Sequence, residues 1–530
     1  MNLFCIRLIL CLLSSVLINN AVFSQVSSTQ IDHLVADAMK KFNVTGVAVG
    51  IVHNVQIIHN KGYGLKSIDS DEKVNEHTKF AIASNSKAFT ATALAILIEE
   101  GKLSWKDKVK DHIPEFKMYN DYVTENFTIT DLITHRSGLG LGSGDLMFIP
   151  DGGNFTIKDV LSSFQHFKPQ SAFRTKFDYD NLLYFVAGEV TARVSGMSWE
   201  AFVEKRILQP LEMDNSFSSV SMLKDKNNLA SPHSAEKGSL KKLQMFEEMV
   251  NGAAGGIYSN VDDLCNWMLV HLNKGRYGKN LEKKLFSDAS QREMWKIHTT
   301  LDANPNPRYN SHFSGYDLGW FLGDMNGNMT VSHGGELPGM VSQTLLIPDL
   351  NLGLVILTNS SSGSGLVYGV IQMIIDSYMA LDEYDWIDHY HKHFLSQQNN
   401  ADAINTKVWE TVKSNKKIKI LPDDYIGIFE DKWFGKIEIF KKNDKLWFKS
   451  YRSPKLNGQM YYYKSNAFAI KWEYQDMNAD AFAIFSMDEE GKAQSIKMKG
   501  ISPNIDFSFD FQDLDLHRIH IDKQASSLLK

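Results

Sequence analysis

The chain of 530 residues is longer than one ordinary domain, and its 43% hydrophobic and 11% aromatic content is typical of a globular protein with large cores. The formal net charge of −6 is small for this length, and no sustained basic run appears. These features argue against a disordered or fibrous protein and against nucleic acid as a partner.

The N-terminus has the pattern of an export signal. Arg7 precedes an apolar run of about ten residues at 8–17, and Val22-Phe23-Ser24 resembles a cleavage site. We predict a signal peptide over residues 1–24, and therefore a secreted or periplasmic protein with no stable membrane anchor after cleavage. An uncleaved N-terminal anchor is the alternative, although the run is shorter than the ~20 residues that a membrane span needs.

Residues 25–393 alternate helical patterns with short apolar runs. Residues 46–52 and 55–58 predict one strand pair near the start, and residues 343–348 and 352–359 predict another near the end. Strands at both ends of a long helical middle predict an α+β domain: one antiparallel sheet flanked by helices, with its first and last strands adjacent, plus an all-helical region.

The segment 394–418 is polar and is predicted to be a linker. Beyond it, residues 419–530 change to short alternating runs separated by turn residues, which predict a small all-β barrel of about eight strands. We expect this domain to fold by itself and to shape substrate access without taking part in the chemistry. The predicted strands include residues 436–440, 445–449, 481–485 and 507–511.

The strongest chemical signal is Ser84-x-x-Lys87 at the start of a long helical pattern that stops at Gly101. A spacing of three puts both side chains on one helix face, one turn apart. The free N–H groups of a first turn favour negative charge on an oxygen under attack. A serine hydroxyl needs a neighbour to take its proton, and a buried, deprotonated lysine can do so.

Two further motifs follow in the chain. Tyr179-x-Asn181 precedes an apolar helix and offers a phenol that can pass protons and an amide that can hold a lysine or a substrate carbonyl. His333-Gly334-Gly335 precedes the final strand pair, where two glycines allow a substrate backbone to lie close. No G-x-S-x-G is present, which argues against an α/β-hydrolase.

In this order and with these separations, the three motifs resemble those of the penicillin-recognising serine hydrolases: class C β-lactamases, D-alanyl-D-alanine peptidases and related esterases. Residues 129–139 are also very close to a hallmark of that family. The resemblance covers about residues 30–380 and implies the β-lactamase/DD-peptidase-like fold. The region after 418 resembles the lipocalin-like domain appended to some of these hydrolases.

The resemblance implies a mechanism through a covalent acyl-Ser84 intermediate, with no cofactor and no metal. Lys87 and Tyr179 would move the proton and later activate water, and Asn181 would position Lys87 and the substrate. The backbone N–H groups of Ser84 and Glu336 would form the oxyanion hole, each donor contributing ~3 kcal/mol. The substrate-binding set is therefore Asn181, His333, Gly334, Gly335 and Glu336.

One departure bears on the substrate. The third motif of β-lactamases usually begins with lysine, whereas His333 stands here, and an imidazole of ordinary pKa near 6.5 is mostly neutral at pH 7. This favours an esterase or a D-amino-acid peptidase over a β-lactamase, acting on a small-molecule or peptide substrate such as a cell-wall fragment. A true β-lactamase and a slowly turning-over penicillin-binding sensor stay open, as does a homo-oligomeric state.

Overall fold

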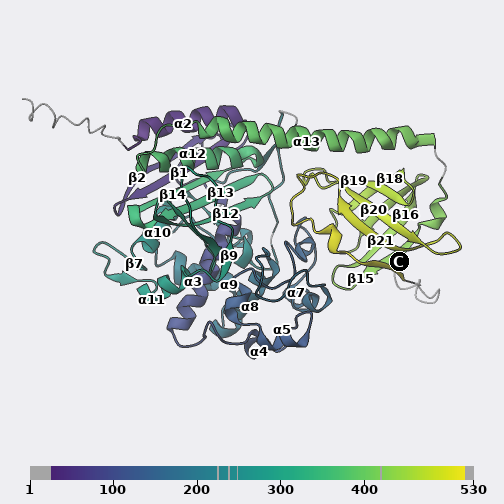
Figure 1. Cartoon of the computed structure of the whole chain (residues 1–530), viewed down its shortest axis with the longest axis horizontal. Helices are drawn as coiled ribbons and strands as arrows, with labels where there is room; N and C mark the ends of the chain where they lie inside the picture. The colour runs from purple at the N-terminus through teal and green to yellow at the C-terminus, as the bar shows by residue number, and fades with distance from the viewer. Residues whose placement is uncertain (1–24, 224–225, 237–238, 248, 418–419, 520–530) are drawn as a thin grey trace, which may run out of the picture.

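The computed structural model describes residues 25–519 except 224–225, 237–238, 248 and 418–419. The predicted signal peptide lies outside the described residues. The chain forms an α+β unit and a closed barrel, joined by one long helix (Figure 1). None of the described helices has the length and apolar character to cross a membrane.

The α+β unit is built on an antiparallel sheet in the order β2-β1-β14-β13-β12-β11-β10-β9. Val47 of β1 lies opposite Thr358 of β14, so the first and last strands of this unit are adjacent, which confirms the predicted arrangement. The strands are β1 (Gly46–His53), β2 (Gln56–Gly64), β9 (Thr299–Leu301), β10 (Ser314–Tyr316), β11 (Phe321–Met325), β12 (Asn328–Leu337), β13 (Met340–Ile347) and β14 (Leu352–Thr358).

Helices cover both faces of this sheet. On one face, α2 (Ser28–Phe42) and α12 (Ser364–Tyr378) pack together; on the other, α10 (Val261–Leu272) packs against β1 and β14. Below the sheet in Figure 1 lies the helical region, where α3 (Ser86–Glu99) packs against α8 (Leu182–Ser195). Every residue of α3 from Ser86 to Leu97 is buried, so this helix is a fixed support for the motif at its start.

Short elements complete this unit. They are α4 (Val109–His112), α5 (Asp121–Asn126), α6 (Ile129–Leu132), α7 (Ile157–Ser163), α9 (Trp199–Val203) and α11 (Asp288–Met294), with the strand pairs β3 (Phe80–Ala81) and β6 (Tyr258–Ser259), β4 (His233–Glu236) and β5 (Ser239–Lys242), and β7 (Arg276–Tyr277) and β8 (Lys283–Lys284).

The segment predicted as a linker is largely helical. α13 (Trp386–Ser414) has 29 residues and is therefore about 43 Å long at ~1.5 Å per residue. It packs on α12 at one end and on β18 of the barrel at the other (Figure 1). Val408 and Val412, one helical turn apart, pack with Ala469 and Ile501 of the barrel. These apolar contacts stabilise the helical conformation of the segment that its polar composition predicted to be a linker.

The C-terminal region is a closed eight-stranded antiparallel barrel, as predicted, with β15 pairing β22 to close it. Its strands are β15 (Gly427–Asp431), β16 (Gly435–Lys442), β17 (Lys445–Ser450), β18 (Asn457–Lys464), β19 (Ala467–Trp472), β20 (Ala481–Met487), β21 (Ala493–Gly500) and β22 (Leu516–Ile519).

One predicted strand of this barrel is wrong. Residues 507–511 alternate polar and aromatic residues, yet they form a loop and the start of a single 3₁₀ turn between β21 and β22. Their side chains contact the α+β unit: Phe507 packs against Tyr179, and Ser508 and Asp510 hydrogen-bond to the chain around residue 145. The loop is therefore held by side-chain contacts with the α+β unit and not by pairing with a neighbouring strand.

Candidate active site

Ser84 lies in a 3₁₀ turn (Ala83–Asn85) immediately before α3, at the end of a buried strand. Ala83 has a φ of 49°, which is uncommon for a residue with a β-carbon and marks a constrained turn. Ser86 fixes the turn, because its hydroxyl donates to the Ala83 carbonyl at 2.7 Å and accepts the Ile257 N–H at 3.1 Å. Ser84 itself stays half-buried and faces the cavity described below.

Lys87 is completely buried, and its amine contacts three oxygens. Nζ is 3.1 Å from Ser84 Oγ, 2.7 Å from Asn181 Oδ1 and 2.7 Å from the Ala254 carbonyl oxygen. The amide and carbonyl oxygens only accept, so each takes one N–H of the amine. A neutral amine then has its lone pair left for the hydroxyl proton of Ser84.

Burial lowers the pKa of Lys87 to about 7, against the opposing effect of the buried carboxyls Asp145 and Asp180. Desolvation disfavours the charged ammonium, and the carboxyls favour it. A substantial fraction of Lys87 is therefore neutral at pH 7, whereas an exposed lysine is almost entirely charged. The chemistry expected from Ser84-x-x-Lys87 has its physical basis in this burial.

Asn181 connects Lys87 to a group that the sequence reasoning missed. Its Oδ1 accepts from Lys87, and its Nδ2 donates to Asp145 Oδ2 at 2.8 Å. Both ends of the Asn181 amide are thus engaged by protein groups. Asp145 is fully buried, and desolvation raises its pKa well above the usual value although hydrogen bonds from Asn181 and Ser508 oppose the shift. No motif marks Asp145, because its partners come from distant parts of the chain.

Tyr179 lies beside the Ser84 hydroxyl. Lys87 Nζ is 4.8 Å from the centre of the Tyr179 ring, and the His135 ring packs against the Tyr179 ring with centroids 4.2 Å apart. Burial raises the pKa of Tyr179 above its ordinary value, although a hydrogen bond with Ser84 acts in the opposite direction. Tyr179 is therefore a protonated phenol at neutral pH, and Lys87 is the group of the two that titrates near 7.

His333 is 2% exposed, and both of its ring nitrogens are engaged. Nδ1 lies 2.6 Å from the Gly334 carbonyl, which can only accept, so Nδ1 carries the proton. Nε2 then accepts from the Tyr316 hydroxyl at 3.1 Å. Burial and the nearby Lys87 lower the pKa of His333 to about 3, so the imidazole is neutral at pH 7.

The third motif lies on the edge of β12 beside the nucleophile turn. The β11–β12 pairing ends with Phe321 opposite Ser332, so from His333 onward β12 pairs with β13 alone among the described strands. A β-carbon on Gly335 would be 3.0 Å from the Ser84 nitrogen, which shows how closely the two backbones approach. The free edge gives an extended substrate a place to lie.

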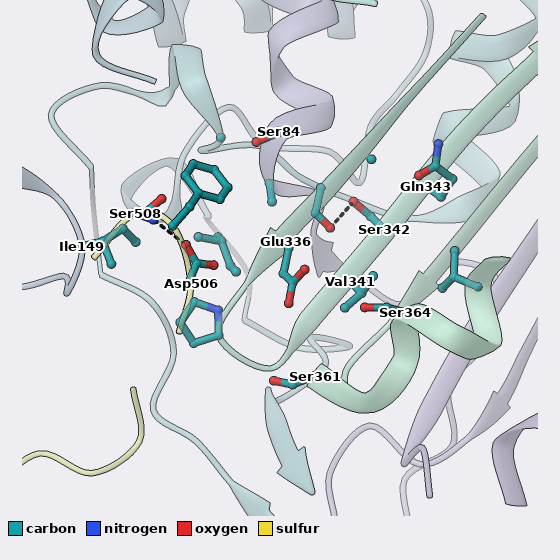
Figure 2. A pocket seen from close by; sticks show the side chains of 18 of the residues that line it. Ser84, Ile149, Glu336, Val341, Ser342, Gln343, Ser361, Ser364, Asp506 and Ser508 are labelled. Atoms are coloured by element: carbon teal, nitrogen blue, oxygen red, sulfur yellow. Dashed lines mark hydrogen bonds between the residues drawn. The ribbon is translucent and has the colours of Figure 1, made fainter. Parts of the chain in front are cut away.

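These residues line a cavity of about 840 Å³, which contains Ser84, Tyr179, Asn181 and residues 333–336. The structure thus brings all the predicted site residues together; Lys87 is buried and does not line the cavity, but its amine contacts Ser84 and Asn181, which do. Figure 2 shows Glu336 on β12 and Asp506 on the C-terminal loop, both facing the cavity. The surrounding protein and the Asp506 carboxylate raise the pKa of Glu336 to about 7, although its side chain is open to the cavity.

The charged side chains that line the cavity are all acidic among the described residues. Its described lining residues include the carboxyls of Glu336, Asp476 and Asp506 and no lysine or arginine. Asp476 forms an ion pair with Lys241, whereas the Glu336 carboxyl has no hydrogen-bond or ion-pair partner among the described residues. The cavity is therefore better suited to a neutral or cationic group than to an anion.

The C-terminal loop is the second feature that the sequence reasoning missed. Residues 504–509 line the cavity, except Ile505, and Phe507 meets the Tyr179 ring edge-to-face with centroids 5.9 Å apart. Sequence alone shows an alternating run here, which is typical of a strand and carries no sign of a contact with another domain.

Among the described residues, no group of three or more His, Cys, Asp or Glu side chains is arranged to hold a metal ion. The histidines and aspartates at 385–393 lie on the first turns of α13, where Asp388 pairs with Lys41 and Lys392.

Comparison with known proteins gives two family matches. The Beta-lactamase model matches residues 31–368, and a model described as Domain of unknown function (DUF3471) matches residues 416–518. The first match covers more than half of the chain, and it includes the three motifs and Asp145, but not the cavity-lining residues of α13 and the barrel. The second covers the barrel.

Two curated relatives show a low sequence identity to this chain. Protein flp of Staphylococcus aureus (strain MW2) is 28% identical over 340 residues, which are 63% of this chain and 64% of that protein. The chain thus spans slightly less than two thirds of the length of that relative. Unguisins hydrolase ungD of Aspergillus violaceofuscus (strain CBS 115571) is 25% identical over 406 residues, 70% of this chain and 69% of that protein.

Two solved structures share the fold. An octameric penicillin-binding protein homologue from Pyrococcus abyssi aligns with a TM-score of 0.59 and 18% identity, covering 92% of this chain and 99% of that chain. A penicillin-binding protein from Bacillus halodurans aligns with a TM-score of 0.52 and 22% identity, covering 64% of this chain and 98% of that chain. The expected β-lactamase/penicillin-binding-protein fold is confirmed.

Proposed function

Because the chain belongs to the Beta-lactamase family of serine hydrolases, we propose that it hydrolyses an ester or amide through a covalent acyl-Ser84 intermediate. One observation carries the proposal: the buried Lys87 amine, with a pKa of about 7, lies 3.1 Å from Ser84 Oγ. A base of that pKa next to a serine hydroxyl is what nucleophilic catalysis at neutral pH requires.

Acylation follows from the positions of these groups. The proton of Ser84 passes to the lone pair of Lys87 as Oγ bonds to the substrate carbonyl carbon. The backbone N–H groups of Ser84 and Glu336 stabilise the resulting oxyanion. As the carbonyl re-forms and the bond to the leaving group breaks, the leaving group takes a proton from the Tyr179 phenol, which the Lys87 ammonium replaces. Each oxyanion donor contributes ~3 kcal/mol, and the base accelerates acylation by roughly 10²–10⁴-fold.

Deacylation reverses these roles. A water molecule loses a proton to Lys87 as its oxygen bonds to the acyl carbon, and the bond between that carbon and Ser84 Oγ breaks. Ser84 Oγ takes that proton back from the Lys87 ammonium, and the product leaves as a carboxylic acid. Asn181 keeps the amine oriented in both steps because its Oδ1 accepts one N–H throughout.

The substrate favoured by this site is a neutral ester or a D-amino-acid peptide with a free ammonium group. His333 cannot anchor a carboxylate as lysine would, since it is neutral and both ring nitrogens are engaged. The carboxylates of Glu336 and Asp506 repel an anion and attract a cation. β-Lactam hydrolysis is the less favoured alternative, because these antibiotics carry a carboxylate.

A substrate panel tests the proposal. The mature protein is incubated with a neutral p-nitrophenyl ester, D-alanine p-nitroanilide or nitrocefin, and the mass of the intact chain is followed. We expect an acyl adduct on Ser84 and turnover of the first two compounds. A fluorophosphonate probe should label the native chain and the Ser364→Ala control, which changes another cavity serine, but not Ser84→Ala.

Two outcomes would change the assignment. Full labelling of Ser84→Ala would remove the mechanism. A burst of product equal to the enzyme concentration, followed by a stable acyl adduct, would identify a penicillin-binding sensor and not an enzyme that turns over.

Export and assembly complete the proposal. We propose that the signal peptide over residues 1–24 is cleaved, so that the enzyme acts in the periplasm or outside the cell; N-terminal sequencing of the secreted chain should begin at Gln25. The octameric structural neighbour motivates the hypothesis of a homo-oligomer, which light scattering of the purified chain tests.

A further inference from the structure

The C-terminal loop makes a set of buried hydrogen bonds to the chain that holds Asp145. The fully buried Asp510 carboxyl group, whose pKa burial raises well above its ordinary value, accepts the Gly144 N–H at 2.7 Å and the Leu146 N–H at 2.9 Å. These are the two residues that flank Asp145. The barrel therefore fixes the backbone on both sides of a side chain that belongs to the other domain.

Ser508, two residues before Asp510, reaches Asp145 itself. Its hydroxyl donates to Asp145 Oδ2 at 2.8 Å, and the same oxygen accepts from Asn181 Nδ2 at 2.8 Å. Asn181 Oδ1 in turn accepts from Lys87 Nζ at 2.7 Å. A continuous chain of hydrogen bonds thus runs from the barrel to the amine beside Ser84, through side chains that are 6% exposed or less.

The same series of hydrogen bonds affects the pKa of Lys87. Asp145 raises the pKa of Lys87, in opposition to the larger effect of burial. The Ser508 hydroxyl favours the ionised form of Asp145 by donating to it. Among the described residues Asp145 Oδ1 has no partner, so removing the Ser508 hydroxyl leaves Asn181 Nδ2 as the one side-chain donor to this buried carboxyl.

Close packing also holds the C-terminal loop against the turn that precedes Asp145. A β-carbon on Gly142, which has a φ of 70°, would lie 2.8 Å from the Phe507 ring and 3.0 Å from the Phe507 carbonyl oxygen. The Gly142 N–H also donates to the Tyr179 carbonyl at 2.8 Å. The turn before Asp145 is thus packed between the barrel loop and the second motif.

We propose that the C-terminal domain completes the catalytic machinery of the same chain, with Ser508 and Asp510 as positioning residues that act on Lys87 through Asp145 and Asn181. The inference rests on the proposed role of Lys87 as base and goes beyond it. It replaces the expectation that this domain only shapes substrate access.

The test uses the full-length chain and a small neutral p-nitrophenyl ester, whose access the loop does not limit. Ser508→Ala should lower kcat roughly tenfold and leave KM within about twofold, since the buried Asp145 carboxyl loses one of its two side-chain donors and holds Asn181 and Lys87 less firmly. Ser508→Thr keeps the hydroxyl and should retain activity. Ser502→Ala is the matched control, because Ser502 is a buried loop serine of the same domain whose hydroxyl, within the described part of the chain, accepts only the Asn504 N–H.

The pH profile separates positioning from mere stability. With less negative charge on Asp145, the pKa of Lys87 falls, so the acid limb of kcat/KM should move to lower pH by roughly half a unit in Ser508→Ala and further in Asp145→Asn. The other titratable groups around Lys87 are unchanged in these variants. They are Asp180 and Tyr184 at the start of α8, Tyr179, His135 of the preceding loop and His333 of β12.

The outcomes are distinguishable. A folded Ser508→Ala variant with native kcat and an unmoved profile would overturn the inference while leaving Ser84 labelling, and so the proposed function, intact. A higher KM for bulky substrates alone would likewise return the loop to a role in access. A native chain that is not labelled on Ser84 would overturn both proposals.

Discussion

Gly335 of β12 lies directly against the carbonyl oxygen of Ile82, two residues before Ser84: a β-carbon built on Gly335 would be 2.1 Å from that oxygen. The same β-carbon would be 2.6 Å from Ser342 Oγ. Contacts under 3.0 Å with backbone cannot be relieved by a rotamer change, so the strand or the nucleophile turn would have to move.

Gly335→Ala should therefore reduce kcat/KM by at least about 100-fold, because a displacement of the order of 1 Å at the nucleophile has that effect. Gly334→Ala is the matched control: its β-carbon would approach the far end of the flexible Gln343 side chain at 2.8 Å, and the backbone oxygen of Ser342 at an ordinary 3.8 Å. Activity of both variants on a neutral ester, with circular dichroism to verify folding, provides the measurement. Equal activity in the two variants would contradict this account of the close approach.

The second prediction concerns Lys87. Because the neutral amine is the base and its pKa is about 7, kcat/KM for a neutral ester should rise with pH and level off above an apparent pKa near 7. Lys87→Met keeps an unbranched side chain, one atom shorter, without the base; it should lose roughly 10²–10⁴-fold in rate and the pH step with it. A pH–rate profile of both proteins is the measurement.

The same pKa predicts a stability effect. Lys87 binds its proton less readily in the folded chain than in the unfolded chain, where the pKa is ordinary, near 10.4. Between pH 7 and 10 the unfolded state therefore binds more protons, and the contribution of this residue to the free energy of unfolding rises with pH. Lys87→Met should flatten that rise in denaturant titrations. A steeper rise in the variant would contradict the sign of the shift.

The third prediction concerns the charge of the cavity. Glu336→Gln and Asp506→Asn each remove a carboxylate without changing its shape, and should raise the ratio of kcat/KM for nitrocefin over that for a neutral ester about two- to fivefold. For Glu336 the gain should be larger at pH 8 than at pH 6, because its pKa of about 7 leaves it mostly protonated at pH 6. Asn478→Asp, which adds a carboxyl to the lining, should shift the ratio the other way. A ratio unchanged in all three variants would exclude a charge effect.

The fourth prediction concerns the contact between the two domains. Arg452 of the barrel binds both carboxylate oxygens of Asp159 at 2.8 and 2.9 Å and lies over the Phe155 ring at 4.0 Å. Arg452→Met should lower the free energy of unfolding by about 1 kcal/mol, and a double-mutant cycle with Asp159→Asn should recover most of that as coupling. Additive effects of the two substitutions would show that the ion pair contributes nothing.

Much of the architecture could be predicted from sequence because it depends on local pattern. The apolar runs near residues 46–58 and 343–359 predicted strands, and the turn-separated alternation after 418 predicted the barrel. Where local pattern was ambiguous, the prediction was wrong: residues 507–511 alternate like a strand, but their partners are in the other domain. The polar segment that contains Val408 and Val412 is helical because these two residues pack against the barrel, which the local sequence pattern does not show.

The sequence by itself determined which residues could carry the chemistry, because a spacing of three on a helix puts Ser84 and Lys87 on one face wherever the helix lies. Only the tertiary structure decided how reactive that pair is. The pKa of Lys87 depends on complete burial and on Asp145, and Asp145 depends on Ser508, which is 363 residues away along the chain. Desolvation and electrostatic interactions act through space, so side chains distant in sequence set the basicity of the amine.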